Sequence, residues 1–327
     1  MRHTKLFLMT SLALSLAAAH CGSSDSDANG TAGMGGSGGA ADAGSDATAA
    51  KDIVDTAVAA GSFKTLVAAA QAAGLEATLR SAGPFTVFAP TDTAFAAVPA
   101  FLVSQLTTAP YKTELALILK YHVLAGAVKA ADVLNKTQDV TTVEGGKLSV
   151  DGTSGSVVLN GGPKVTMADV LASNGVIHVI DGVLLPTIVD TAVGYDDGTT
   201  KFSQLVGAVT AADLGATLSG PGTFTVFAPT DKAFDDLKAS LGQATYDAIV
   251  ADKAKLTKLL TYHVLGSVAY AKDVATGDVT TVEGSTLALT AAGGAVTAGG
   301  ANVVLADLPA SNGVIHVIDK VLVPSDL

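Results

Sequence analysis

The side chains in this chain that are best suited to chemistry are histidines at repeated positions. One pair, His122 and His263, follows a tyrosine in the sequence YHVL. The other pair, His178 and His316, lies within the segment ASNGVIHVID, which occurs twice without a change. An imidazole can ligate a metal ion or act as a general base near neutral pH. The chemical hypotheses are therefore a metal site that joins the two histidines of each repeat, or a histidine that acts as a general base.

The residues around these histidines favour burial over chemistry. No carboxylate or thiol stands at a metal-ligand spacing such as HExxH, and no serine lies on a nucleophile-elbow turn. Apart from His178, residues 176–180 are apolar on both alternating faces, which is typical of a strand that is covered on both sides. His122 similarly ends an apolar helical face. We expect the rings to be buried, hydrogen-bonded and kept neutral by desolvation.

The other repeated polar residues are also explained best by structural roles. Threonine followed by aspartate before a helical pattern predicts a helix cap, and Asn-Gly before a strand predicts a turn. The aspartate at the end of each histidine strand is expected to bond the backbone or an imidazole, and a Ser-His-Asp triad stays open as an alternative. These positions, with the two tyrosines, are Thr91, Asp92, Tyr121, Asn174, Asp181, Thr230, Asp231, Tyr262, Asn312 and Asp319.

The elements that must position these residues change in type along each repeat. Residues 53–75 have apolar side chains at helical spacing, broken near Gly61, and a second apolar helical face covers 114–122. A short strand is expected at 85–88. Alternating strand patterns dominate from residue 140 to residue 185. Helices followed by strands indicate an α+β fold with a largely antiparallel sheet.

The chain contains an internal duplication of this pattern. FTVFAPTD occurs at 85–92 and 224–231, and VTTVEG at 140–145 and 279–284, in the same order. The period of about 140 residues is far longer than that of a solenoid repeat. We therefore expect two whole domains, a first repeat at 51–186 and a second repeat at 187–327.

The residues before the repeats predict export. Residues 1–20 combine a positive start with an apolar run of signal-peptide length. Cys21 is the single cysteine, and its place resembles the lipobox of bacterial lipoproteins, although His20 stands where that motif usually has a small residue. The alternative is an ordinary secretory signal that is cut near Ala19. Residues 21–50 are rich in Gly, Ser and Asp and predict a disordered tether.

Composition limits the classes of partner. The formal net charge is −11, and an acidic surface repels phosphate backbones, so we expect no nucleic-acid partner. Apolar residues make up 49 % of the chain and charged residues only 15 %. This composition is sufficient for buried cores without disulfides.

The repeated motifs together resemble the fasciclin (FAS1) family. FTVFAPTDTAF at 85–95, the Tyr-His pair and NGVIHVIDGVLLP at 174–186 carry the resemblance, and each motif recurs in the second repeat. The resemblance implies two tandem FAS1 domains, each a β-sandwich wedge flanked by helices, in a family of secreted or membrane-anchored adhesion and matrix proteins without a common enzymatic activity. In animal members an Asp-Ile pair before the Asn-Gly turn is implicated in integrin binding. The matching partner-binding candidates are Asp169, Val170, Asp307 and Leu308.

These observations predict a non-catalytic adhesion or matrix-binding module at the cell envelope, exported, lipid-anchored through Cys21 and without a cofactor or metal. Two linked modules suit binding, because the second contact gains from effective concentration. One alternative is a carrier of an apolar small ligand, which requires a cavity of at least roughly 300 Å³ in each repeat. The less favoured alternative is a hydrolase, which requires a serine or carboxylate beside His122 or His178 in an open cleft.

Overall fold

The computed structural model describes residues 50–327, which lie within one compact unit. The signal peptide, Cys21 and nearly all of the tether predicted above lie outside the described residues. Within the described residues, no helix is both long enough and apolar enough to cross a membrane.

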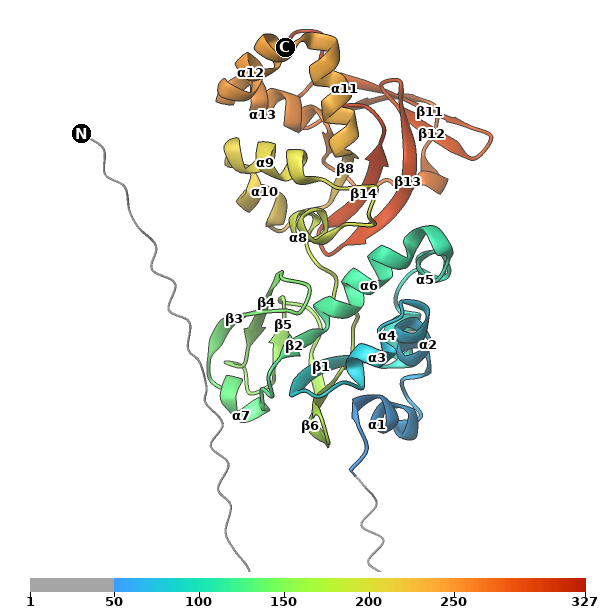
Figure 1. The fold of residues 1–327 in the computed structure, drawn as a ribbon, viewed down its shortest axis with the longest axis vertical. Coiled ribbons are helices and arrows are strands. Elements are labelled where there is room, and N and C mark those ends of the chain that lie inside the picture. The colour runs from blue at the N-terminus through green and yellow to red at the C-terminus, as the bar shows by residue number, and fades with distance from the viewer. Residues whose placement is uncertain (1–49) are drawn as a thin grey trace, which may run out of the picture. The chain divides into compact units, whose positions relative to one another are not determined.

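The first repeat begins with helices and ends with strands, as expected (Figure 1). Its elements are α1 (Ile53–Ala60), α2 (Lys64–Ala72), α3 (Glu76–Leu79), β1 (Phe85–Pro90), α4 (Asp92–Ala96), α5 (Ala100–Leu106), η1 (Ala109–Tyr111), α6 (Lys112–Tyr121), β2 (Val123–Ala125), α7 (Ala130–Val133), β3 (Thr137–Thr141), β4 (Lys147–Asp151), β5 (Val158–Leu159), β6 (Val165–Ala172) and β7 (Gly175–Ile180).

The second repeat follows the same order with longer late strands. Its elements are α8 (Ile188–Gly194), α9 (Ser203–Ala211), α10 (Gly215–Ser219), β8 (Phe224–Pro229), α11 (Asp231–Leu241), α12 (Gln243–Ala251), α13 (Lys253–Tyr262), β9 (Val264–Leu265), η2 (Ala271–Asp273), β10 (Gly277–Thr280), β11 (Thr286–Ala292), β12 (Ala295–Ala298), β13 (Ala301–Ala310) and β14 (Gly313–Ile318).

The sheets of both repeats are built around one parallel pair of strands. In the first repeat the strand order is β2-β1-β7-β6, with a separate sheet β3-β4-β5, and in the second all strands join in the order β10-β11-β12-β13-β14-β8-β9. The first and last strands of each repeat run parallel, β1 with β7 and β8 with β14, whereas the other pairs are antiparallel. The α+β class predicted from the sequence is confirmed.

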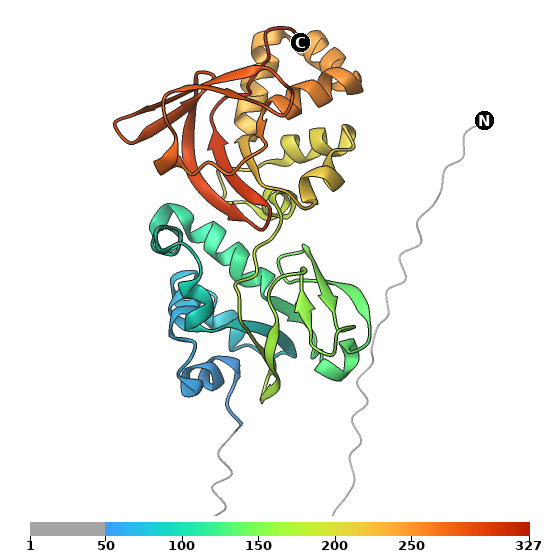
Figure 2. The same cartoon turned by 180° about the vertical axis from the view of Figure 1, so that it is seen from behind.

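Helices cover one side of these sheets. In Figures 1 and 2, α1–α6 lie on one side of β1 and the sheet β3-β4-β5 lies on the other, while the β11–β12 hairpin projects away from α11–α13. The core between α1, α2 and the sheet contains Ile53, Phe63, Val87 and Ile177. A second core beneath β3-β4-β5 contains Phe88, Tyr121 and Leu148. Each histidine strand therefore lies between two apolar layers.

Candidate functional site

The Tyr-His histidines lie at the C-terminal end of a helix and are almost fully buried. His122 is 1 % exposed, its Nδ1 lies 2.8 Å from the carbonyl oxygen of Ile118, and its Nε2 accepts a hydrogen bond from the backbone N–H of Leu184 at 2.9 Å. This pattern assigns the neutral Nδ1–H tautomer. Burial lowers the pKa of His122 to about 4, so the ring is uncharged at neutral pH. His263 makes the same two kinds of bond and has the same lowered pKa of about 4.

The neighbouring tyrosines link the same helices to the later strands. The Tyr121 hydroxyl donates to the carbonyl oxygen of Lys147 at 2.7 Å and accepts from the Asn160 amide at 2.9 Å. Burial raises the pKa of Tyr121 to about 12. The Tyr262 hydroxyl donates to the carbonyl oxygen of Thr286 at 3.0 Å. Both hydroxyls thus connect a helix to the first residues of a hairpin strand.

The strand histidines hold a bulge in the neighbouring strand. Nε2 of His178 lies 2.8 Å from the carbonyl oxygen of Val128, and Nδ1 accepts from the backbone N–H of Asp169 at 3.2 Å. The ring stacks on Phe88 with 5.6 Å between ring centroids. His316 repeats both bonds, to Ala269 and Asp307, and burial lowers its pKa.

The ring nitrogens of all four histidines are thus already engaged by the backbone. A metal ion or a proton-accepting role would require one of these bonds to break. Within residues 50–327, no group of three or more His, Cys, Asp or Glu side chains is arranged to hold a metal ion.

The Thr-Asp pairs cap two different helices. Thr91 Oγ1 accepts from the backbone N–H of Ala94 and so caps its own helix, α4. The Asp92 carboxylate instead accepts from the backbone N–H groups of Thr65 and Lys64, at the start of α2. These bonds, with that of Thr65 the largest effect, lower the pKa of Asp92. In the second repeat, Thr230 caps α11 and Asp231 accepts from Gln204 at the start of α9.

The asparagine of each Asn-Gly turn joins three segments. Asn174 Oδ1 accepts from the backbone N–H of Ile53, and its amide nitrogen donates to the carbonyl oxygens of Leu79 and Ser81. Asn312 makes the same bonds to Ile188, Leu218 and Gly220. The next residue must be glycine, because a Cβ on Gly175 would lie 2.1 Å from the carbonyl oxygen of Phe85.

The strand-end aspartates bond the backbone at or next to the start of the neighbouring strand. Asp181 Oδ1 accepts from the N–H of Lys164 at 2.7 Å, and Asp319 Oδ1 accepts from the N–H of Asn302 at 2.8 Å. The Asp319 carboxylate also accepts from the Asn302 side-chain amide. Neither carboxylate is among the hydrogen-bond partners of a described histidine.

The Asp169–Val170 pair forms the bulge that His178 holds. The pairing of β6 with β7 shifts register between Met167 and Val170, and Asp169 takes a positive φ of 58°. Its carboxylate accepts from the backbone N–H of Ala130 at 3.0 Å. Val170 turns inward and packs on the core next to Ile177. Asp307 has the same positive φ, and its carboxylate accepts from the N–H of Ala271.

The two bulges differ in what covers them. In the second repeat, Asp307 is 5 % exposed and Leu308 is fully buried. Helix α5 of the first repeat covers this strand, because Gln105 Nε2 donates to the carbonyl oxygen of Ala306 at 2.9 Å and Phe101 packs edge-on against Tyr270.

In the first repeat the same strand segment is open. Asp169 is exposed, as are Met167 at 59 % and Leu171 at 68 %. Strand β6 is also the outermost strand of its sheet. We call residues 166–172 the β6 edge. It offers unpaired backbone groups and apolar side chains, which are the features that let an edge strand pair with another chain.

A buried acid that the sequence analysis did not single out lies where α6 meets α8. Glu114 is fully buried, and neither of its carboxylate oxygens has a hydrogen-bond partner. Burial, and then the charge of Glu144, raises the pKa of Glu114 to about 8. The equivalent residue of the second repeat is the exposed Lys255. Comparing the two repeats in the sequence would have shown this exchange, but not the burial.

Comparisons with known proteins agree with this architecture. The fasciclin domain model matches residues 61–186 and 200–324. The transforming growth factor-beta-induced protein ig-h3 of Sus scrofa is 30 % identical over 244 residues, which cover 74 % of this chain and 35 % of that protein. Human periostin is 28 % identical over 257 residues, which cover 77 % of this chain and 30 % of periostin. The chain thus spans about a third of the length of these animal relatives.

Bacterial proteins match one repeat at higher identity. The uncharacterized protein sll1735 of Synechocystis is 47 % identical over 134 residues, which cover 41 % of this chain and 97 % of that protein. Among solved structures, the FAS1 domain pair of the insect cell adhesion molecule fasciclin I has 19 % sequence identity and a TM-score of 0.39, covering 83 % of this chain and 98 % of that one. The family model accounts for most of both repeats, and the chain belongs to the fasciclin family, with two fasciclin domains in tandem.

Proposed function

We propose that this protein is a non-catalytic binding module of the cell envelope, and that it contacts a protein partner through the β6 edge. The observation that carries the proposal is the contrast between the two bulged strands. In the second repeat the strand is covered by α5, whereas its counterpart in the first repeat exposes Met167 and Leu171. A face that the protein covers in one repeat and leaves open in the other is suited to an external partner.

The kind of partner follows from the chemistry of the edge. An extended peptide segment can add a strand to β6 through backbone hydrogen bonds, with Met167 and Leu171 giving apolar contacts. The exposed Asp169 carboxylate favours a basic residue in that segment.

Export and anchoring complete the proposal. The predicted signal peptide would send the chain out of the cytoplasm, and lipidation of Cys21 would hold it at the envelope on the tether of residues 21–50. Incorporation of labelled palmitate into the full chain, lost in Cys21→Ser, tests the anchor. Palmitate incorporation into Cys21→Ser, or no incorporation into the wild type, would contradict lipidation at Cys21.

The contact is tested by capture of envelope proteins on the full-length chain. We expect Met167→Lys and Leu171→Lys each to lose the captured partner, because a lysine on an edge strand opposes pairing. The matched control is Val304→Lys, which places the same charge on an exposed residue of β13 and should leave capture unchanged. Equal capture by all variants, or equal loss in the control, would exclude the β6 edge as the contact.

A further inference from the structure

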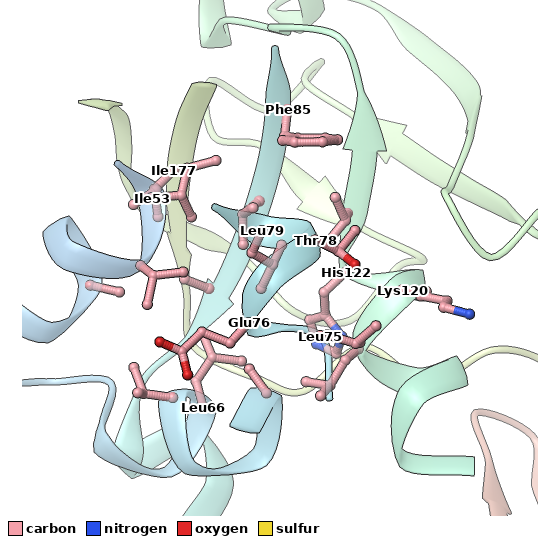
Figure 3. A pocket seen from close by; sticks show the side chains of 18 of the residues that line it. Ile53, Leu66, Leu75, Glu76, Thr78, Leu79, Phe85, Lys120, His122 and Ile177 are labelled. Atoms are coloured by element: carbon pink, nitrogen blue, oxygen red, sulfur yellow. The ribbon is translucent and has the colours of Figure 1, made fainter. Parts of the chain in front are cut away.

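The first repeat contains an apolar cavity between its helices and its sheet. The cavity has a volume of about 240 Å³ and is lined by α1, α2, α3, β1, α6 and β7. Figure 3 shows Ile53, Leu66, Leu75, Leu79 and Ile177 converging on this space. It is therefore built from side chains that are far apart in the sequence, and it lies apart from the β6 edge proposed as a protein contact.

The cavity wall is mostly apolar, and its polar side chains are Glu76, Thr78, Lys120 and His122. Both nitrogens of His122 bond to backbone groups, so the ring presents only its carbon atoms to the cavity. The Glu76 carboxylate is engaged by Arg80, which also bonds Asp52 and Asp55 and so joins α1 to α3. In Figure 3 the Lys120 ammonium group turns away from the space. A charged or strongly polar ligand would lose its hydration there without compensation.

The second repeat shows how the same fold can close this space. Its corresponding cavity has a volume of only about 70 Å³. Most lining residues are identical or similar in the two repeats, but Ala70 of α2 is replaced by Val209 of α9, which is buried in the core. The larger side chain occupies part of the space that the first repeat leaves open. The second repeat therefore shows that this fold can form with most of the cavity filled.

An empty apolar cavity lowers the stability of a small domain in proportion to its volume. The first repeat retains the cavity and its destabilising effect, although valine in place of Ala70, as in the second repeat, would reduce the volume. We propose that the first repeat binds a small, uncharged, apolar molecule in this cavity. Both cavities are smaller than the roughly 300 Å³ required above for a carrier of a drug-sized ligand. The inference therefore concerns a smaller ligand, and the first repeat only.

The volume sets the size of the ligand. An engineered cavity of roughly 150 Å³ holds benzene, and sites for drug-sized ligands begin near 300 Å³. The cavity of the first repeat lies between these values, which suits a molecule of about two fused rings or a branched hydrocarbon of similar size. Naphthalene is therefore a suitable probe.

The experiment is a titration of the full-length chain with naphthalene, followed by NMR of isoleucine methyl groups. The two repeats supply an internal comparison, because Ile53 and Ile177 line the cavity and Ile188 and Ile315 are their counterparts in the second repeat. We expect saturable shifts of the Ile53 and Ile177 methyl signals, with the Ile188 and Ile315 signals unchanged. Ala70→Val should weaken the affinity for naphthalene by about tenfold or more, since it fills the site.

Two further variants make the result decisive. Val209→Ala should enlarge the second cavity and make the Ile188 methyl signal respond to naphthalene. Ala70→Ser keeps the volume nearly unchanged and is the control for substitution at that position, so it should bind more tightly than Ala70→Val. No saturable shift at Ile53 and Ile177, equal shifts in both repeats of the wild type, or an affinity unaffected by Ala70→Val would overturn the proposal.

Discussion

The backbone N–H of Asp169 donates a hydrogen bond to Nδ1 of His178, so a ring on β7 fixes the bulge of β6. The other ring nitrogen bonds the carbonyl oxygen of Val128, in the segment between β2 and α7. One imidazole therefore joins three segments of the first repeat. The histidine that looked best suited to chemistry is placed to shape the strand that carries the proposed contact.

Replacing this ring should loosen the bulge. His178→Ala leaves the Val128 carbonyl and the Asp169 N–H without their partner, which should cost about 1–3 kcal/mol in the free energy of unfolding. Amide hydrogen exchange along the β6 edge should become faster, because the bulge loses its support. Urea denaturation and hydrogen exchange measure the two effects. His316→Ala is the matched variant in the second repeat. It should speed amide exchange along β13 less, because Gln105 also bonds that strand. Unchanged exchange at residues 166–172 in His178→Ala would contradict the proposed role of His178.

The buried Tyr-His histidine should make the first repeat sensitive to acid. The pKa of His122 falls from 6.5 to about 4 on folding. A group with a lowered folded pKa stabilises the fold fully above pH 6.5, and this stability is lost as pH falls through the folded pKa. The free energy of unfolding should fall by about 3 kcal/mol between pH 6.5 and pH 4.

Urea unfolding at a series of pH values tests this effect by difference. His122→Gln should be less stable than the wild type at neutral pH, and the gap between them should narrow steadily as the pH falls from 6.5 to 4. His263→Gln should show the same narrowing for the second repeat, where the pKa is also lowered to about 4. A gap that stays constant with pH would mean that the ring is not held neutral by burial.

The sequence predicts the local features of these repeats much better than their contacts across space. The duplication, the α+β class and the threonine caps follow from patterns within short windows. Asp92 caps α2 rather than its own helix. This contact depends on how the two helices pack, which a short stretch of sequence cannot show. The burial of Glu114 likewise depends on α8, which lies in the other repeat. The exchange of Ala70 for Val209 is visible when the two repeats are aligned, but its effect on volume is visible only in the folded chain.

The stability of the first repeat should depend on both the oxygen and the nitrogen of the Asn174 side-chain amide. Asn174→Ala removes the acceptor for Ile53 and the donor for Leu79 and Ser81, so we expect a loss of at least about 2 kcal/mol. Asn174→Asp keeps the acceptor but points a carboxylate oxygen at two carbonyl oxygens, and it should be no more stable than the alanine variant. Chemical denaturation measures both. An aspartate variant as stable as the wild type would show that the amide donor bonds contribute little.

Glu114 should give the first repeat a pH dependence of opposite sign. Its folded pKa of about 8 lies above its ordinary value of 4.5, so the folded state favours the neutral acid. Stability from such a group is fully present below pH 4.5 and is lost as pH rises through the folded pKa. The groups that face it are Glu144 in the loop after β3, and Tyr195 after α8, whose own raised pKa is partly due to Glu114.

Glu114→Gln removes the ionisation while keeping the shape of the side chain. The variant and the wild type should have similar stability below pH 4.5, and the variant should gain about 3 kcal/mol relative to the wild type by pH 7, levelling off above pH 8. Thermal and urea unfolding across this range measure the difference. Glu144→Gln is a second test, because it removes the charge that is the smaller cause of the raised pKa of Glu114, and it should therefore weaken the pH dependence without abolishing it. A Glu114→Gln difference that does not grow between pH 4.5 and 8 would mean that the acid reaches solvent when it ionises, and that the contact between α6 and α8 opens readily.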